Sequence, residues 1–211
     1  MKKVVLLGGV IAFFAACSNP SASSEAADAQ EVIEEVQSDV SYEVNATESV
    51  VKWTGTKPTG SQHAGTVGVT SGELAMRDGA IAAGSFVLDM TSLDVIDEGI
   101  DEESEAKLIG HLSTGDFFEV EKYPSANFSI TGATADSLTG NLTIKDITKS
   151  ISFPYTMGVE GNKLTANATF SIDRTQWGVT FNSGNFFENL GEHLINDAVQ
   201  FEVALVANSG E

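Results

Sequence analysis

Three histidines are the residues of this sequence best suited to binding a metal. His63, His111 and His193 stand on three separate segments. If the imidazoles converged, they could ligate zinc, with Asp89 or Asp116 as a fourth donor. They lack local ligand spacing, however, and His111 ends a predicted helix, where the helix dipole favours a partly charged ring in any case. We therefore expect no metal and no other cofactor, and we expect His63 and His111 to bind loop backbone or to line the mouth of a ligand cavity.

Arg174 is the next candidate functional side chain, because its guanidinium can bind an anion or a carbonyl oxygen. It continues the alternation of Phe170 and Ile172, so it is expected on the same inward face. In one interpretation the guanidinium binds the phosphate or quinone oxygen of a ligand. In the other, which we favour, Arg174 is a structural plug that is paired with an acid and stacked on a tryptophan. The candidate partners are Asp116, Asp173, Trp53 and Trp177.

No arrangement typical of a catalytic site occurs in the sequence. It has no nucleophile elbow, no paired cysteine and histidine, and no local metalloprotease motif. The acids between Asp94 and Glu105 lack the spacing of an EF-hand loop. The glycines between Gly55 and Gly72 do not match a phosphate-binding fingerprint. We interpret the acids as solvated surface charge and expect the protein not to be an enzyme.

The single cysteine, Cys17, follows a short targeting segment. Two lysines precede 13 apolar residues, a run too short for a membrane-spanning helix, which needs about 20. Two alanines stand just before Cys17, an arrangement that resembles the lipobox of bacterial lipoproteins, in which the cysteine is lipidated. We predict a signal peptide over residues 1–16 and a lipidated Cys17. The alternative is a plain secretory signal with an incidental cysteine.

Residues 17–40 are rich in serine and alanine and then in acids, with no basic residue. Such a segment has too few large apolar side chains to form a core. We predict a flexible tether there, with a frayed helix near residues 25–37. The chain carries a formal net charge of −19, and binding to phosphates depends on Lys and Arg. Nucleic acid is therefore excluded as a partner, and contact with a membrane is assigned to the N-terminal lipid.

From Tyr42 onward the dominant hydrophobic period is two, which is typical of half-buried strands. The clearest runs cover residues 151–159 and 164–172, with the turn residues Gly161-Asn162 between them, and Asp78-Gly79 marks another turn. Strands joined by tight turns form an antiparallel meander. A sheet of eight or nine strands usually closes, which removes its exposed edges. The sequence thus predicts an all-β fold, an antiparallel barrel of about eight strands over residues 41–208.

One short helix is expected in a long connection between strands, at about residues 101–112. Asp101, Glu102 and Glu103 place negative charge in its first turn, at the positive end of the helix dipole. Glu103 also stands four residues before Lys107, a spacing that favours an ion pair on a helix surface. Pro124 then restricts the backbone at the entry of the next strand.

The strands have one mainly apolar face, which points inward in a closed barrel. Small residues, Ala166 and Ala168, stand between the larger ones. A barrel of eight strands is either just filled by side chains or wide enough for one small ligand, and the period alone leaves both outcomes open. The residues expected to bind a ligand in the lumen are Phe86, Leu88, Phe128, Ile130, Leu142, Phe153, Tyr155, Phe170, Ile172 and Phe201, with His63, His111 and Arg174 at the mouth.

Many short motifs recur in an order typical of one protein family. They are WTGTK (53–57), HAGT (63–66), SGEL (71–74), GSFVLDMTSL (84–93), GHLS (110–113), DFF (116–118), YP (123–124) with Phe128, GNLTIK (140–145), ISFP (151–154) and IDRTQWGV (172–179). With these motifs the chain, from residue 42 to about 206, resembles the YceI-like family.

The resemblance implies a lipocalin-like barrel, periplasmic or secreted, that binds polyisoprenoids, here in a lipoprotein form. It implies an isoprenoid or quinone-like lipid as the partner, carried or stored in the lumen. We expect a bacterial cell-envelope protein, lipid-anchored on the periplasmic side or at the outer membrane, and a homodimer is left open. The alternative function is that of a non-catalytic structural or stress-protective envelope protein with a solid barrel.

Overall fold

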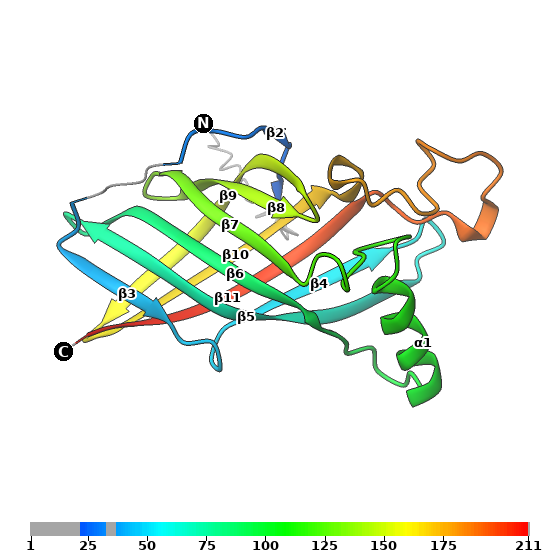
Figure 1. Ribbon diagram of the computed structural model, residues 1–211, viewed down its shortest axis with the longest axis horizontal. Coiled ribbons are helices and arrows are strands. Elements are labelled where there is room, and N and C mark those ends of the chain that lie inside the picture. The colour runs from blue at the N-terminus through cyan, green and yellow to red at the C-terminus, as the bar shows by residue number, and fades with distance from the viewer. Residues whose placement is uncertain (1–21, 33–36, 211) are drawn as a thin grey trace, which may run out of the picture.

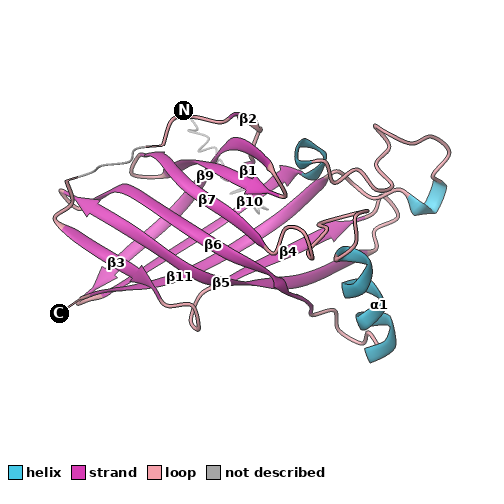
Figure 2. Cartoon of the chain, viewed as in Figure 1, coloured by secondary structure: helices cyan, strands magenta, loops and turns pink. Residues whose placement is uncertain are grey.

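A computed structural model describes residues 22–32 and 37–210, which fold around one closed β-barrel (Figures 1 and 2). Nine long strands build the barrel: β3 (Val40–Val44), β4 (Val50–Thr56), β5 (Gln62–Arg77), β6 (Ala80–Val95), β7 (Ser125–Ala133), β8 (Ser137–Ile144), β9 (Ile147–Glu160), β10 (Lys163–Asp173) and β11 (Ala198–Ser209). β3 and β4 both lie between β11 and β5, so they share one position in the wall. The wall of the barrel therefore has eight strand positions, which we call staves, as predicted.

Strands that follow one another in the sequence are, with few exceptions, hydrogen-bonded neighbours in the barrel wall. β5 to β11 pair in chain order as an antiparallel meander, and β11 returns to β3 and β4 to close the wall. The hairpin between β5 and β6 turns at Asp78 and Gly79, which both have positive φ, of 51° and 77°. Two successive residues of positive φ define the tight turn whose twist suits a hairpin. The Asp-Gly signal in the sequence thus marks a real turn.

One α-helix, α1 (Glu102–Leu112), lies at one end of the barrel (Figure 1). Asp101 caps it by accepting a hydrogen bond from the Ser104 amide at 3.0 Å, and Glu103 pairs with Lys107 at 2.6 Å. Two short 3-10 helices, η1 (Arg174–Trp177) and η2 (Gly191–His193), lie in the connection from β10 to β11. Among the described residues, no helix combines the length and apolar character needed to cross a bilayer.

Buried side chains form two clusters inside the barrel. The larger runs along the lumen and includes Leu74, Phe128, Phe153 and Phe170. The second lies where α1 and the following loop meet the barrel, and it holds Leu112, Phe117, Val120 and Val179 among others. The second cluster packs against the end of the barrel near α1.

Part of the segment expected to be a free tether packs on the barrel. Two short strands, β1 (Ala22–Ser23) and β2 (Ala27–Asp28), pair with β10 and β9. The tether prediction needs correction for residues 22–32, because small side chains and backbone hydrogen bonds are enough to attach an extended segment to a strand. The predicted signal peptide and Cys17 lie outside the described residues and stay predictions.

Candidate functional site

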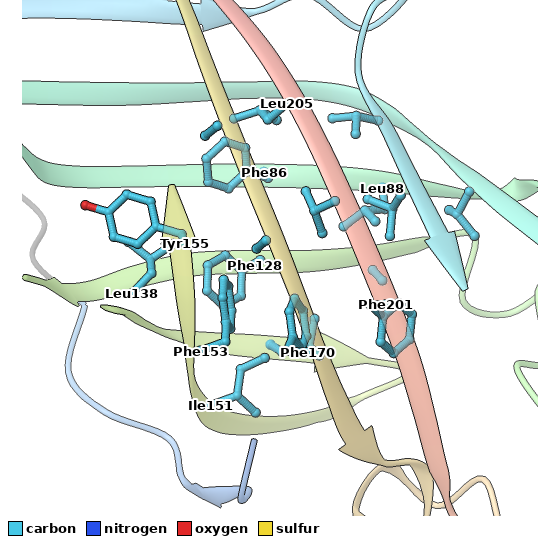
Figure 3. Close-up of a pocket in the computed structure, with 18 of the residues that line it drawn as sticks. Phe86, Leu88, Phe128, Leu138, Ile151, Phe153, Tyr155, Phe170, Phe201 and Leu205 are labelled. Atoms are coloured by element: carbon cyan, nitrogen blue, oxygen red, sulfur yellow. The ribbon is translucent and has the colours of Figure 1, made fainter. Parts of the chain in front are cut away.

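The barrel encloses an apolar cavity (Figure 3). About 180 Å³ of it is open to the centre of a water molecule, many times the ~10–15 Å³ that a single water needs by this measure. The lining comes from all eight staves and is apolar apart from Tyr155 and Asn167: Val51, Val67, Val69, Leu74, Ile81, Phe86, Leu88, Met90, Leu93, Phe118, Ala126, Phe128, Leu138, Leu142, Ile144, Ile151, Phe153, Tyr155, Ala166, Asn167, Ala168, Phe170, Phe201, Val203 and Leu205. The interior is hollow, which the sequence left open.

Five phenylalanines from five strands form a continuous belt along the cavity wall. Phe86 and Phe128 lie 6.4 Å apart between ring centroids, and Phe128 and Phe153 lie 5.6 Å apart. Phe153 stacks on Phe170 at 4.1 Å with planes 9° apart, and Phe170 is followed by Phe201 at 5.8 Å. We call these five rings the phenylalanine belt. Rings in contact with one another hold each other in place, so the belt gives the lumen a firm wall.

Small side chains create the space beside the belt. β10 carries Ala166 and Ala168 between Leu164 and Phe170, on the same inward face. A leucine or phenylalanine at either alanine would occupy part of the cavity. The alternation of large and small residues on one strand is therefore what separates this lumen from a solid core.

Eight of the ten apolar residues predicted to bind a ligand line the cavity, whereas two do not. Ile130 and Ile172 point into the core but are packed at 1% and 3% exposure, away from the cavity lining. The residues that line it are Phe86, Leu88, Phe128, Leu142, Phe153, Tyr155, Phe170 and Phe201.

Several lining residues escaped the sequence analysis because of bulges. β5 shifts register against β6 between Thr66 and Gly68, where the extra residues are in β6, and between Val69 and Ser71, where β5 has one extra residue. The extra residue in β5 shifts the phase of the alternation. The buried positions therefore change from Val67 and Val69 to Leu74 and Met76, and the strand has no single period of two over its length. The repeated valines of that strand were the available signal.

The ring of Tyr155 lines the cavity, and its hydroxyl points out of the cavity. The hydroxyl donates to the Thr134 carbonyl at 2.9 Å in the β7–β8 connection. Burial of the phenol, followed by the nearby Asp136 carboxylate, raises the pKa of Tyr155 above its ordinary value. Tyr155 is thus a neutral side chain that anchors the rim of the barrel, not a charged group in the lumen.

The histidines lie outside the cavity lining and apart from one another. His63 pairs with Asp97 at 2.6 Å, while His111 pairs with Asp116 at 3.2 Å and packs edge-on against Phe181. In the part of the chain that the structure describes, no three His, Cys, Asp or Glu residues gather as a metal site. The expectation that His63 and His111 line the mouth of the cavity needs correction, because each ring is tied to a carboxylate on the loops around α1.

Arg174 is a structural plug, and its expected place in the ligand site is corrected accordingly. It is 6% exposed and donates to the carbonyl oxygens of Asn196, Val179 and Ile195 at 3.2, 2.8 and 3.2 Å. A fourth bond reaches Asp197 at 3.3 Å, so the acid paired with Arg174 is neither of the two expected candidates, Asp116 and Asp173. Burial lowers the pKa of Arg174, and the nearby Asp197 carboxylate opposes this effect. The guanidinium fastens the loop before β11 and is not part of the cavity lining.

One buried polar atom lacks a partner. Among the described residues, Trp53 Nε1 is the buried side-chain nitrogen or oxygen without a hydrogen bond. Trp53 packs against the second buried cluster, of which Val67, Met90 and Leu93 also border the cavity, and Trp53 itself is not part of the lining. Its ring lies directly over Gly65 on the neighbouring strand, where a side chain would collide with it. A donor N–H is therefore buried without an acceptor, in the cluster that adjoins the cavity.

The closed antiparallel wall and the apolar lumen define a lipocalin-like barrel, an architecture that can hold one small ligand inside. The chain belongs to the YceI-like domain family, whose pattern matches residues 42–207. This confirms the family predicted from the motifs.

Two relatives with similar sequences are both named as UPF0312 proteins. A UPF0312 protein of Staphylococcus aureus (strain N315) is 31% identical over 117 residues, which cover 52% of this chain and 66% of that protein. A UPF0312 protein of Pseudomonas putida (strain W619) is 31% identical over 80 residues, or 33% of this chain and 42% of that protein. The alignments thus span less than two thirds of these relatives.

Two solved structures share the fold. One is a polyisoprenoid binding domain from Saccharophagus degradans implicated in plant cell wall breakdown, with a TM-score of 0.60 and 14% identity over 82% of this chain and 100% of that one. The other is BcnA of Burkholderia cenocepacia, with a TM-score of 0.55 and 21% identity over 78% of this chain and 99% of that one. At these identities the likeness concerns the fold alone.

Proposed function

We propose that this protein binds an isoprenoid-type amphiphile, a polyprenyl lipid or a quinone, in the barrel lumen and that it carries or stores this ligand in the bacterial cell envelope. The observation that supports the proposal most is the apolar cavity beside the phenylalanine belt. The YceI-like family and the polyisoprenoid binding domain with the same fold support this class of ligand. We assign the protein no catalytic role.

The energetics of such binding need no charged anchor. At about 0.8 kcal/mol per buried CH2, a chain of twenty carbons gains about 16 kcal/mol on leaving water. The loss of translational and rotational freedom, together with ordering, offsets ~4–15 kcal/mol. The balance favours binding of an apolar chain. A head-group oxygen that reached Trp53 Nε1 would give this buried N–H an acceptor.

The alternative function required a solid barrel. A structural or stress-protective protein of this fold would fill its interior with side chains, whereas the cavity here is open. We therefore favour the carrier. The direct test is to extract the purified protein with organic solvent and identify the extract by mass spectrometry. A prenyl lipid in stoichiometric amount supports the proposal, and a protein that stays empty after incubation with prenyl-lipid vesicles contradicts it.

A matched pair of variants on β10 tests whether the lumen is the site. Ala168→Phe places a ring inside the cavity, whereas Thr165→Phe places the same ring on the exposed outer face of the same strand, where β10 is paired with β9. We expect Ala168→Phe to lose at least tenfold in affinity for geranylgeraniol and Thr165→Phe to bind as the parent does. Equal binding by both variants would move the site away from the lumen.

We propose further that Cys17 is lipidated and holds the barrel on the periplasmic side of a membrane or at the outer membrane. The sequence before Cys17 supports this proposal. Metabolic labelling with an alkyne fatty acid should mark the parent protein and leave Cys17→Ser unmarked, with Cys17→Ser recovered in the soluble fraction. A homodimer stays a prediction, which light scattering of the purified protein would test.

A further inference from the structure

The wall of the barrel is incomplete between β9 and β10. These strands pair from Lys163 opposite Glu160 to Ala168 opposite Tyr155, and the pairing stops there. β10 nevertheless continues to Asp173, and β9 extends back to Ile147. We call the stretch where the two strands run without pairing, residues 151–154 and 169–172, the seam.

Pro154 explains why the pairing ends at this point. Tyr155 donates its amide to the Asp136 carbonyl toward β8, so alternate residues of β9, including Pro154, direct their backbone toward β10. A proline has no N–H to give to that ladder. Pro154 therefore cannot donate the hydrogen bond that would have continued the pairing of β9 with β10.

The N-terminal segment fills the seam. β1 pairs in parallel with β10 at Phe170 and Ser171, and β2 pairs antiparallel with β9 at Ser150 and Lys149. Between them, Ser24 donates its amide to the Ser171 carbonyl at 2.8 Å and its hydroxyl to the Ser152 carbonyl at 2.7 Å. Ser24 is 4% exposed. One serine thus bridges the two strands where their own ladder is absent.

The far end of this segment is held by an amide pair. Asn141 of β8 donates its side-chain NH2 to the Gln30 carbonyl at 2.7 Å and accepts from the Gln30 amide at 2.9 Å. This exchange imitates the pairing of two strands. Asn141 is buried on the outer face of the wall, so the N-terminal segment covers it. We call residues 22–30 the strap.

The strap is attached by few apolar contacts. Apart from Ser24 and Ala26, its residues are exposed, and Ala26 is the strap residue that packs against the core cluster. Local opening is easiest where few buried apolar contacts hold a segment. The strap can therefore leave the wall at a much smaller free-energy cost than any full strand.

The cavity lies directly behind the seam. Phe153 and Phe170 belong to the two strands that part there, both line the cavity, and their rings stack at 4.1 Å (Figure 3). At the end of the barrel near α1, the second buried cluster and the Arg174 plug fill the interior. The seam is thus a place in the described wall where two strands bordering the cavity have no ladder of their own. β6 and β7 also pair only from Ser85 to Asp89, but the seam differs because the strap bridges it with backbone pairing to both strands.

We propose that the seam is the side entrance through which the apolar ligand reaches the lumen and that the strap is its lid. This inference rests on the proposed function, since it assumes a ligand in the lumen. Ala22 stands five positions after Cys17, and five residue steps of fully extended chain span at most roughly 18 Å. A lipid on Cys17 would thus hold a docked strap, and the seam beneath it, close to the bilayer from which such a ligand comes.

The test is to lock the strap and measure how fast the lumen fills. Ala27 lies opposite Ser150 in the β2–β9 pair, and directly opposed residues of antiparallel strands bring their Cβ atoms near disulfide distance. Ala27→Cys with Ser150→Cys is made in the full chain carrying Cys17→Ser, which removes the natural cysteine. The probe is N-phenyl-1-naphthylamine, whose fluorescence rises in apolar surroundings, with geranylgeraniol as competitor.

We expect the oxidised protein to take up and release the probe at least tenfold more slowly than the same protein after reduction, with the same affinity at equilibrium. The matched control is a cross-link in a continuous part of the wall, Thr143→Cys with Thr148→Cys, whose native hydroxyls lie 2.9 Å apart. That cross-link should leave both rates unchanged. In the opposite direction, Ser24→Ala combined with Asn141→Ala loosens the strap and should speed uptake.

The outcomes separate this inference from the proposed function. If the locked protein fills as fast as the reduced one, or if the control cross-link slows it equally, the seam is not the entrance, although the lumen still binds. If the loosened variant fills no faster than the parent, the strap is not the lid. If the parent protein binds neither the probe nor geranylgeraniol, the proposed function itself fails.

Discussion

The phenylalanine belt shows how single residues shape the lumen. Each ring of the belt touches the next, so the rings hold one another in place. The stacked pair Phe153 and Phe170 lies behind the seam and must part when a ligand enters there. Ala166 and Ala168 leave the facing volume empty. The result is a hollow with a firm wall, suited to a flexible apolar chain that adapts to the space it finds.

Trp53 is the residue from which we expect head-group preference. Trp53→Phe removes the unpaired N–H and keeps an aromatic ring. A net hydrogen bond contributes ~0.5–1.5 kcal/mol, so the affinity of the variant for decylubiquinone should fall about 2- to 12-fold. Equilibrium dialysis measures this affinity without relying on tryptophan fluorescence. Binding of dodecylbenzene, which has no strong acceptor, should hardly change. An equal loss for both compounds would mean that Trp53 acts through packing alone.

Arg174 is the residue on which the loop before β11 depends. Arg174→Met leaves three carbonyls and the Asp197 carboxylate without their donor, and breaking a buried pair in this way costs about 3–5 kcal/mol. Arg174→Lys keeps the charge but loses the planar fork, so it should recover only part of this loss. Urea denaturation measures both.

The exposed Arg77 provides the control for these variants. Arg77→Met should change the free energy of unfolding by less than ~0.5 kcal/mol. A loss below ~1 kcal/mol for Arg174→Met would show that the loop does not need the guanidinium.

Helix α1 depends on a cap that titrates. Hydrogen bonds from the amide and hydroxyl of Ser104 lower the pKa of Asp101 from its ordinary value of 3.8. Because the folded state holds this proton less tightly than the unfolded state, the stabilisation is fully present above pH 3.8. It is lost as the pH falls through the lowered pKa. The first turn of α1 should therefore begin to fray below pH 3.8.

Amide hydrogen exchange at Ser104 measures this effect. In Asp101→Ala the amide should exchange faster at neutral pH, and the additional opening below pH 3.8 should disappear. Glu102→Ala removes another acid of the same turn that is not the capping residue and should leave the pattern intact. An Asp101→Ala variant with unchanged exchange at neutral pH would mean that packing of Leu112 alone holds the helix.

For the whole molecule, a ligand enclosed by the barrel must stabilise the fold. A ligand that binds only the folded state at one hundred times its dissociation constant adds ~2.7 kcal/mol. For a chain of this size, each kcal/mol raises the melting temperature by roughly 2–4 °C. Geranylgeraniol should therefore raise Tm by about 5–11 °C in differential scanning calorimetry. Ala168→Phe, with its affinity reduced at least tenfold, should show about half of this shift or less at the same ligand concentration. An equal shift in that variant would place the ligand elsewhere.

Local patterns in the sequence determined most of the barrel. The alternation in β9 and β10 follows from strand geometry, which sends successive side chains to opposite faces, so Phe153, Phe170 and their neighbours could be placed inward. Asp78-Gly79 required a tight turn, and Asp101 with its neighbouring acids marked the start of α1. Each of these features depends on residues a few positions apart, and the motifs that identified the family are equally local.

Contacts between distant residues were decided only by the tertiary structure. The register shifts between β5 and β6 arise from strand pairing across the wall. The Ile195 and Asn196 carbonyls that hold Arg174 and the Asp97 carboxylate that holds His63 come from other segments of the chain. The strap is the clearest case, because residues 22–30 have no apolar pattern of their own and dock only where Pro154 leaves β9 without a partner. Whether the barrel is hollow also depends on how eight separate staves meet. The periodicity of a strand sets which side chains face inward, and only closure of the wall sets how much space remains between them.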